Sequence, residues 1–122
     1  MTLVISISKE TRAMCLKTIG ETRYGGAHPS WACLRAVVKE YLSQRLESER
    51  GRIMCIRFKQ LYDVFVRQVH ADVSRSLMSW MWAPLLLENY GGAVASVEVW
   101  KNGRGGKICF NTQKLRELLA YE

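Results

Sequence analysis

The stretch "EVWKNGRGGKICF", residues 98–110, predicts a β-hairpin with a basic, glycine-rich tip. Apolar residues alternate with other residues on both sides of "KNGRGGK", which is typical of strands with one buried face. The pair Asn102-Gly103 favours a tight turn, because both residues tolerate a positive φ. The tip has three glycines, three basic residues and no acid. Two strands and a short loop are therefore expected here.

The composition of this tip suits contact with phosphate groups. Glycine lets the backbone approach a partner closely, and Lys101, Arg104 and Lys107 supply positive charge. An exposed hairpin that uses lysine and glycine for solubility is the alternative. A nucleotide-binding P-loop is not expected, because "NGRGGK" lacks the strand–GxxxxGK[ST]–helix setting.

The segments before the hairpin predict a helix, a short strand and two more helices. Ser30 can cap a helix over 31–47, and "RIMCIRF", residues 52–58, reads as a strand. A helix over 58–69 follows, and another runs through "RSLMSWMWAPLLLENY", residues 75–90, to a glycine pair. A last short helix, residues 112–122, closes the chain. The residues expected to form one buried helix–helix contact are Phe58, Leu61, Phe65, Val69, Leu34 and Val38.

The first residues of the chain predict a strand and a helix. "TLVISIS", residues 2–8, alternates, so Leu3, Ile5 and Ile7 are expected on one face. Ser8 can cap the helix that follows, with Ala13, Leu16 and Ile19 or Gly20 on one side. A lone strand leaves its edge unpaired, so it should join its twin in a homodimer or another strand of the chain.

This order of elements resembles the winged helix-turn-helix superfamily over residues 30–110. The resemblance implies an α+β fold with a three-helix core and a β-hairpin wing. Residues 1–29 would add a strand-helix extension, and the winged-helix domain with its C-terminal helix would span 30–122. It also implies binding to double-stranded DNA by a homodimeric transcriptional regulator. The DNA-binding residues so implied are Lys101, Asn102, Arg104 and Lys107 in the wing, Arg75, Ser76 and Ser79 on the recognition helix, and Lys59.

Two other interpretations stay open at this point. The helix over 75–90 is rich in tryptophan, and Trp80 and Trp82 cannot share one face, so it could dock on a protein partner. Residues 1–47 resemble a ribbon-helix-helix unit, in which a strand pairs across a dimer and reads the major groove. Thr2, Val4 and Ser6 would then face the DNA.

Charge and composition set limits on the function. The 122 residues carry a formal charge of +7, from 18 basic and 11 acidic side chains, which favours a polyanionic partner. No apolar run reaches the roughly 18 residues of a membrane span, and no leader peptide is recognisable. We therefore expect a cytoplasmic protein with no membrane contact. No nucleophile neighbours His70 and no acidic cluster is visible, so no enzyme, cofactor or catalytic residue is expected.

The four cysteines are Cys15, Cys33, Cys55 and Cys109. None forms a CxxC pair and only two histidines are present, so no metal site is expected. In an ordinary cytosol they would be reduced core residues, which is the interpretation favoured here. Disulfides are the alternative, and their pairing does not follow from the sequence.

Overall fold

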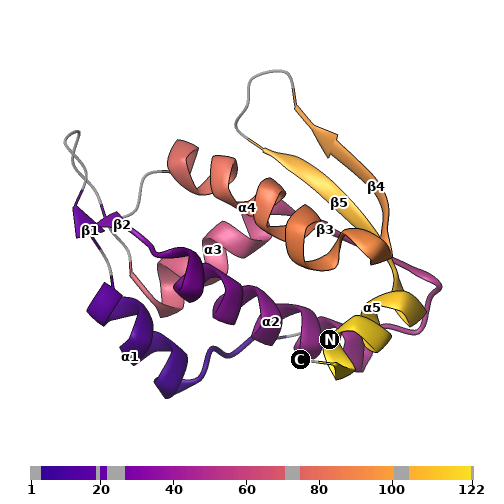
Figure 1. Cartoon of the computed structure of the whole chain (residues 1–122), viewed down its shortest axis with the longest axis horizontal. Helices are drawn as coiled ribbons and strands as arrows, with labels where there is room; N and C mark the ends of the chain where they lie inside the picture. The colour runs from indigo at the N-terminus through magenta and orange to yellow at the C-terminus, as the bar shows by residue number, and fades with distance from the viewer. Residues whose placement is uncertain (1–3, 19, 22–26, 71–74, 101–104, 122) are drawn as a thin grey trace.

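The structure is a computed structural model, and the chain adopts an α+β fold (Figure 1). It describes residues 4–18, 20–21, 27–70, 75–100 and 105–121, with the backbone alone described at 20–21, 27–28 and 75–80. In chain order the elements are α1 (Lys9–Thr18), β1 (Gly20–Glu21), β2 (Ala27–His28), α2 (Trp31–Ser48), β3 (Ile53–Arg57), α3 (Phe58–Gln68), α4 (Arg75–Tyr90), a 3-10 turn (Gly91–Ala93), β4 (Val94–Val99), β5 (Gly106–Asn111) and α5 (Thr112–Ala120).

The main sheet has three antiparallel strands in the order β3-β5-β4. The last strand of the sheet therefore lies between the other two. Its inner face supplies the core with the side chains of Met54, Ile56, Ile108 and Phe110, all of which are buried. The strand predicted over 52–58 is present as β3, and its other residues, Ile53, Cys55 and Arg57, are exposed. Strands β1 and β2, of two residues each, form a separate antiparallel sheet.

The predicted contact between α2 and α3 is confirmed. Phe58, Leu61 and Phe65 on α3 are buried in the same core as Leu34 and Val38 on α2. The sixth residue, Val69, is partly buried against that core. The apolar repeat of α3 therefore reports a helix face that points inward, as its period of 3.6 residues requires.

The other predicted helices are present with nearly the expected bounds. The side chain of Ser30 caps α2 by accepting a hydrogen bond from the Cys33 N–H at 3.1 Å. Helix α4 runs through Pro84 as one element. Helix α5 is capped by Asn111 and buries Leu115. Both hairpin strands form, although β5 begins at Gly106, before the predicted start.

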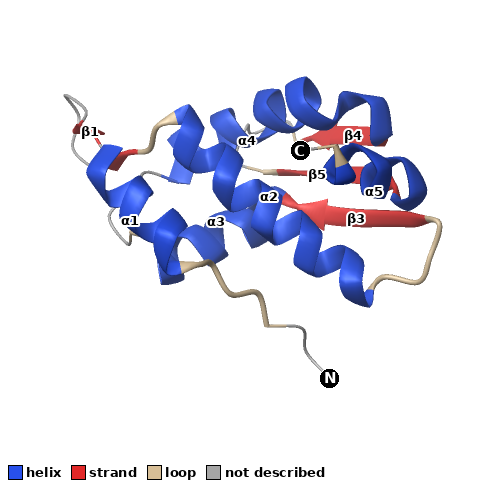
Figure 2. Ribbon diagram, turned by 60° about the horizontal axis from the view of Figure 1, so that its bottom comes forward, coloured by secondary structure: helices blue, strands red, loops and turns tan. Residues whose placement is uncertain are grey.

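The predicted N-terminal strand is wrong, because residues 4–8 belong to no sheet (Figure 2). Ile5 and Ile7 are buried and Val4 and Ser6 are exposed, so the alternation itself is correct. The backbone is paired with two side chains instead of a strand. From α2, Gln44 Oε1 accepts from the Ser6 N–H at 2.9 Å, and its Nε2 donates to the Ser6 carbonyl at 2.7 Å.

Gln68 of α3 binds the opposite edge of the same segment. Its Oε1 accepts from the Ile7 N–H at 2.7 Å, and its Nε2 donates to the Ile5 carbonyl. The Ser8 N–H donates to Glu40 Oε1 at 2.8 Å. Both edges of residues 5–8 are thus occupied within one chain. Residues 5–8 therefore leave no open edge for the twin strand that a ribbon-helix-helix dimer would pair there.

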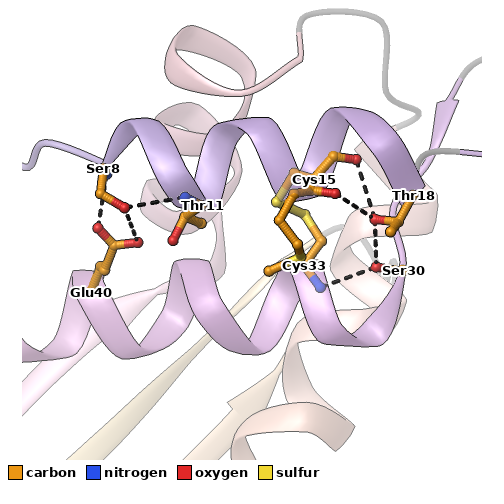
Figure 3. Close-up of a disulfide and its surroundings, with 8 residues drawn as sticks. Ser8, Thr11, Cys15, Thr18, Ser30, Cys33 and Glu40 are labelled. Atoms are coloured by element: carbon orange, nitrogen blue, oxygen red, sulfur yellow. Dashed lines mark hydrogen bonds between the residues drawn. A yellow bond between two sulfur atoms is a disulfide. The ribbon is translucent and has the colours of Figure 1, made fainter.

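The interpretation of the cysteines as free thiols is wrong. Cys15 of α1 is bonded to Cys33 of α2, and Cys55 of β3 is bonded to Cys109 of β5. Figure 3 shows the first bond joining two neighbouring helices, with the Ser8 hydroxyl accepting from the Thr11 N–H at the start of α1. Because the disulfide faces α2, α1 turns Cys15 inward.

The side of α1 that carries Ala13 and Leu16 is not its buried side. Ala13 is exposed, and Leu16 keeps 54% of its surface. A short helix fastened by one covalent bond does not need a full apolar stripe to stay attached. This local linkage could not be read from the helical period.

Candidate nucleic-acid interface

The hairpin of β4 and β5 rises away from the helices in Figure 1 and carries the predicted wing. The hairpin is closely packed next to its tip, where β5 begins. A Cβ built on Gly106 would lie 2.3 Å from the Glu98 carbonyl oxygen and 3.0 Å from the Phe58 ring. Only glycine fits this position without a shift of the neighbouring backbone. The first residue of α3 and the wing strands are thus held in contact.

Trp100 closes the hairpin next to its tip. The backbone N–H of Trp100 donates to the Gly105 carbonyl at 3.0 Å. A Cβ on Gly105 would come within 2.9 Å of the Trp100 indole ring. Trp100 as a whole residue is 43% exposed. Lys101, Asn102 and Arg104 follow Trp100, and they lie outside the described residues.

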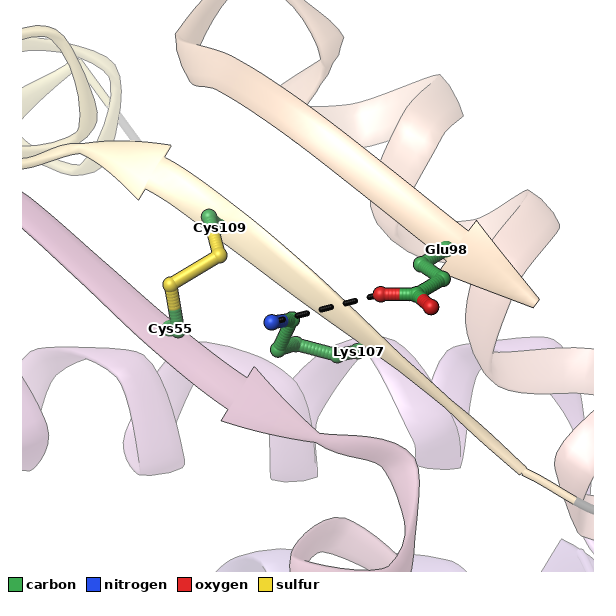
Figure 4. A network of polar contacts seen from close by, with 4 residues as sticks. All are labelled: Cys55, Glu98, Lys107 and Cys109. Carbon is green, nitrogen blue, oxygen red and sulfur yellow. Dashed lines mark ion pairs between the residues drawn. A yellow bond between two sulfur atoms is a disulfide. The ribbon is translucent and has the colours of Figure 1, made fainter. Parts of the chain in front are cut away.

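Lys107 is the wing residue whose surroundings the structure describes. It lies on the outer face of β5, and its Nζ is 4.0 Å from Glu98 Oε2 on β4 (Figure 4). Both side chains are solvent-exposed, so this ion pair contributes about 0–1 kcal/mol. The tip sequence contains no acid, but the neighbouring strand β4 places one beside Lys107.

Arg57 is a basic residue at this end of the sheet that the sequence did not single out. The register places Arg57 of β3 directly opposite Lys107 of β5 and Lys107 opposite Glu98 of β4. Arg57 is exposed, and Lys59 is exposed two residues later in the first turn of α3. The three cations Arg57, Lys59 and Lys107 thus gather where the wing begins. Only the strand register reveals this grouping.

The remaining predicted readers lie on α4. Arg75, Ser76 and Ser79 occupy its first two turns, where the structure describes the backbone alone. Trp80 falls in the same stretch. Trp82, two residues later, is fully buried and meets Phe65 edge to face. Trp82 therefore offers no surface to a partner, because its side chain fills the core. Docking of a protein partner on the Trp80/Trp82 region stays a prediction.

A second group of arginines lies at the opposite end of the sheet. Arg50, Arg52 and Arg116 line a surface hollow of about 730 Å³ at the start of α5. Arg116 is already engaged there, because its Nη2 donates to the carbonyl oxygens of Leu46 and Glu49 at 3.2 and 2.9 Å. Arg116 thereby supplies a hydrogen-bond donor to carbonyl groups at the C-terminal end of α2, where a helix no longer provides its usual backbone partners. Its primary role is therefore structural.

A groove of about 560 Å³ lies between residues 4–5, α2 and α3. Tyr41 forms part of its wall. Its hydroxyl accepts from Arg45 Nη1 at 3.0 Å, and the guanidinium lies 5.8 Å from the ring centroid. Burial raises the pKa of Tyr41, and the charge of Arg45 partly opposes that rise. Tyr41 therefore stays neutral over the physiological pH range.

The structure also bears on membranes and metals, within the residues that it describes. None of these helices combines the length and the apolar character that a membrane crossing requires. No group of three histidine, cysteine or acidic side chains gathers at metal-binding distance in the same part of the chain.

No protein-family model, curated protein or solved structure matches this chain.

Proposed function

We propose that this chain is a winged-helix protein that binds double-stranded DNA and acts as a homodimeric transcriptional regulator in the cytoplasm. The supporting observation is the connection of the elements from α2 to β5. A helix, a strand, two helices and a hairpin follow in that order, and the first strand pairs with the last in the order β3-β5-β4. This order places a basic hairpin immediately after the helix that would enter the major groove.

The distribution of charge supports the same proposal. Three basic residues lie at the wing end of the sheet: Arg57, Lys59 and Lys107. The tip sequence adds Lys101 and Arg104. Phosphate contacts of this kind position a protein on DNA without reading the sequence. Arg75, Ser76 and Ser79 would face base edges from α4. The proposal includes no enzymatic activity, metal or cofactor.

The two disulfides restrict where such a regulator can work. Disulfides persist in oxidising compartments and in the cytosol of some extreme thermophiles. The proposed cytoplasmic location is therefore compatible with the two disulfides in the cytosol of an extreme thermophile. An ordinary reducing cytosol would remove the accessible bond between Cys55 and Cys109.

The test is the salt dependence of DNA binding. Fluorescence anisotropy of a labelled random duplex should show affinity falling linearly in a log–log plot against salt, with a slope of about −0.9 per phosphate contact. The triple variant K101A/R104A/K107A should flatten the slope by about 2–3 units. The variant K9A/R12A/K17A removes the same charge from α1 and should leave the slope nearly unchanged. Equal slopes for all three proteins would overturn the assignment of the wing.

A further inference from the structure

The described strand edges differ in whether side chains bind their outward backbone N–H and C=O groups. The edge of a sheet exposes N–H and C=O groups that another strand can pair with. Apart from the two-residue strands β1 and β2, the structure describes three extended segments with edges of this kind. They are residues 5–8, strand β3 and strand β4.

Two of these segments are closed by side chains of the same chain. Residues 5–8 are bound on both edges by Gln44 and Gln68. On β3, Arg45 Nη2 donates to the Cys55 carbonyl at 3.4 Å, and Gln60 Oε1 accepts from the Arg57 N–H at 3.0 Å. Side chains from α2 and α3 therefore bind both edges of residues 5–8 and two of the outward backbone groups of β3.

Strand β4 has no such closure. Trp100 donates to Gly105 of β5, and hydrogen-bonded positions alternate along an antiparallel pair. Glu98 therefore also bonds to β5, while Val97 and Val99 direct their N–H and C=O groups away from the sheet. Among the described residues, no side chain bonds to these groups.

The side chains at the same positions are exposed and apolar. Val97 keeps 42% of its surface and Val99 keeps 60%. The strand carries neither lysine nor proline, the residues that usually protect an edge from pairing. An added strand would satisfy the backbone and cover both valines at once.

We propose that the β4 edge pairs with β4 of a second copy of this chain, forming one continuous six-stranded sheet across a two-fold axis. The charge on Glu98 disfavours one register. An axis at Glu98 would set two carboxylates directly opposite each other, which is unfavourable. An axis at Val97 sets Glu98 opposite Ser96 of the second copy and Val97 opposite Val97. The strand is therefore self-complementary in the second register.

This inference gives the homodimer of the proposed function a surface, in place of the N-terminal strand. Sedimentation velocity without DNA tests it separately, because a failure here leaves the salt titration of DNA binding unaffected. The parent chain should sediment as a dimer at micromolar concentration. Val97→Lys sets two like charges opposite each other and should weaken the dimer by about tenfold or more.

Ile53→Lys is the matched control. Ile53 is 48% exposed on β3, so the same change is made at a similarly accessible position on the other edge strand, which side chains of α2 and α3 partly cover. This variant should remain dimeric, and circular dichroism should show both variants folded. A monomeric parent, or a dimer that Val97→Lys leaves intact, would overturn the inference. Capture of a different protein by a monomeric parent would overturn it as well.

A cysteine variant tests the register. Directly opposite residues of a hydrogen-bonded antiparallel pair have Cα atoms about 5.5 Å apart, within the range of a disulfide. Val97→Cys should therefore yield a covalent dimer on mild oxidation, and Ile53→Cys should not. Equal cross-linking of the two variants would exclude the two-fold axis at Val97.

Discussion

The ring of Phe65 on α3 meets the indole of Trp82 on α4 edge to face, with centroids 6.4 Å apart and an interplanar angle of 68°. Both side chains are fully buried. Edge-to-face pairs add about 0.5–1.5 kcal/mol to the burial of two aromatic rings. This contact fixes the helix that precedes the wing against the helix before it. The wing is thereby tied to the centre of the core.

Phe65→Ala should lower the free energy of unfolding by about 3–5 kcal/mol, because it removes a fully buried ring and leaves a cavity beside Trp82. Urea unfolding monitored by circular dichroism measures the change. Lys59→Ala, on the exposed side of the same helix, should change it by less than about 0.5 kcal/mol. A loss below about 1 kcal/mol for Phe65→Ala would mean that the α3–α4 packing described here is wrong.

Gly106→Ala should destabilise the protein by about 1–3 kcal/mol, because the added methyl group collides with the backbone of β4 and the ring of Phe58. Gly92→Ala is the matched control, since a Cβ at Gly92 meets no atom within 4 Å. Thermal unfolding of the two variants compares them directly. Equal melting temperatures would show that the packing around Gly106 is looser than these distances indicate.

The sequence predicted the helices and the hairpin because those elements carry their own signals. A period of 3.6 residues in α3 and a turn pair between two alternating segments depend on local chemistry alone. The N-terminal segment misled for a related reason. Alternation at Ile5 and Ile7 reports which side is buried, but it does not report whether a strand or a pair of glutamines binds the backbone. Gln44 and Gln68 are distant in sequence, so no local pattern contains them.

The disulfide pairing and the group of basic residues at the wing could not be predicted without knowing how the strands pair in the folded chain. Cys55 and Cys109 lie opposite each other only because β5 returns between β3 and β4. The same pairing brings Arg57 beside Lys107. No spacing within either strand indicates these partners. The candidate site was therefore predictable in its wing sequence and not in its neighbours on β3.

Gln68→Ala should cost about 1–3 kcal/mol of stability, because it leaves the backbone groups of Ile5 and Ile7 without partners in a partly buried place. Gln44→Ala should cost less, since its bonds to Ser6 are exposed to water that can replace them. Gln113→Ala on the exposed surface of α5 serves as the control and should be neutral. Hydrogen exchange at Ile7 should accelerate in Gln68→Ala and stay slow in the control. An unchanged exchange rate there would contradict the role given to Gln68.

The two disulfides should differ in their resistance to reduction. Cys15 and Cys33 are fully buried, whereas Cys55 is exposed on the outer face of the sheet beside Cys109. A thiolate must reach a sulfur atom to open the bond, so access controls the rate. Dithiothreitol added to the folded protein should therefore open Cys55–Cys109 first. Maleimide labelling followed by peptide mass spectrometry identifies which cysteines have become free.

The more accessible disulfide should also stabilise the fold more, because it closes the longer segment. The partners are 54 residues apart in Cys55–Cys109 and 18 apart in Cys15–Cys33. The loss of chain entropy in the unfolded state then corresponds to about 4 and about 3 kcal/mol. C55A/C109A should accordingly lower the free energy of unfolding more than C15A/C33A, measured by urea unfolding without reductant. The reverse order, with both variants folded, would show that the bond between α1 and α2 stabilises the native packing beyond its effect on the unfolded chain.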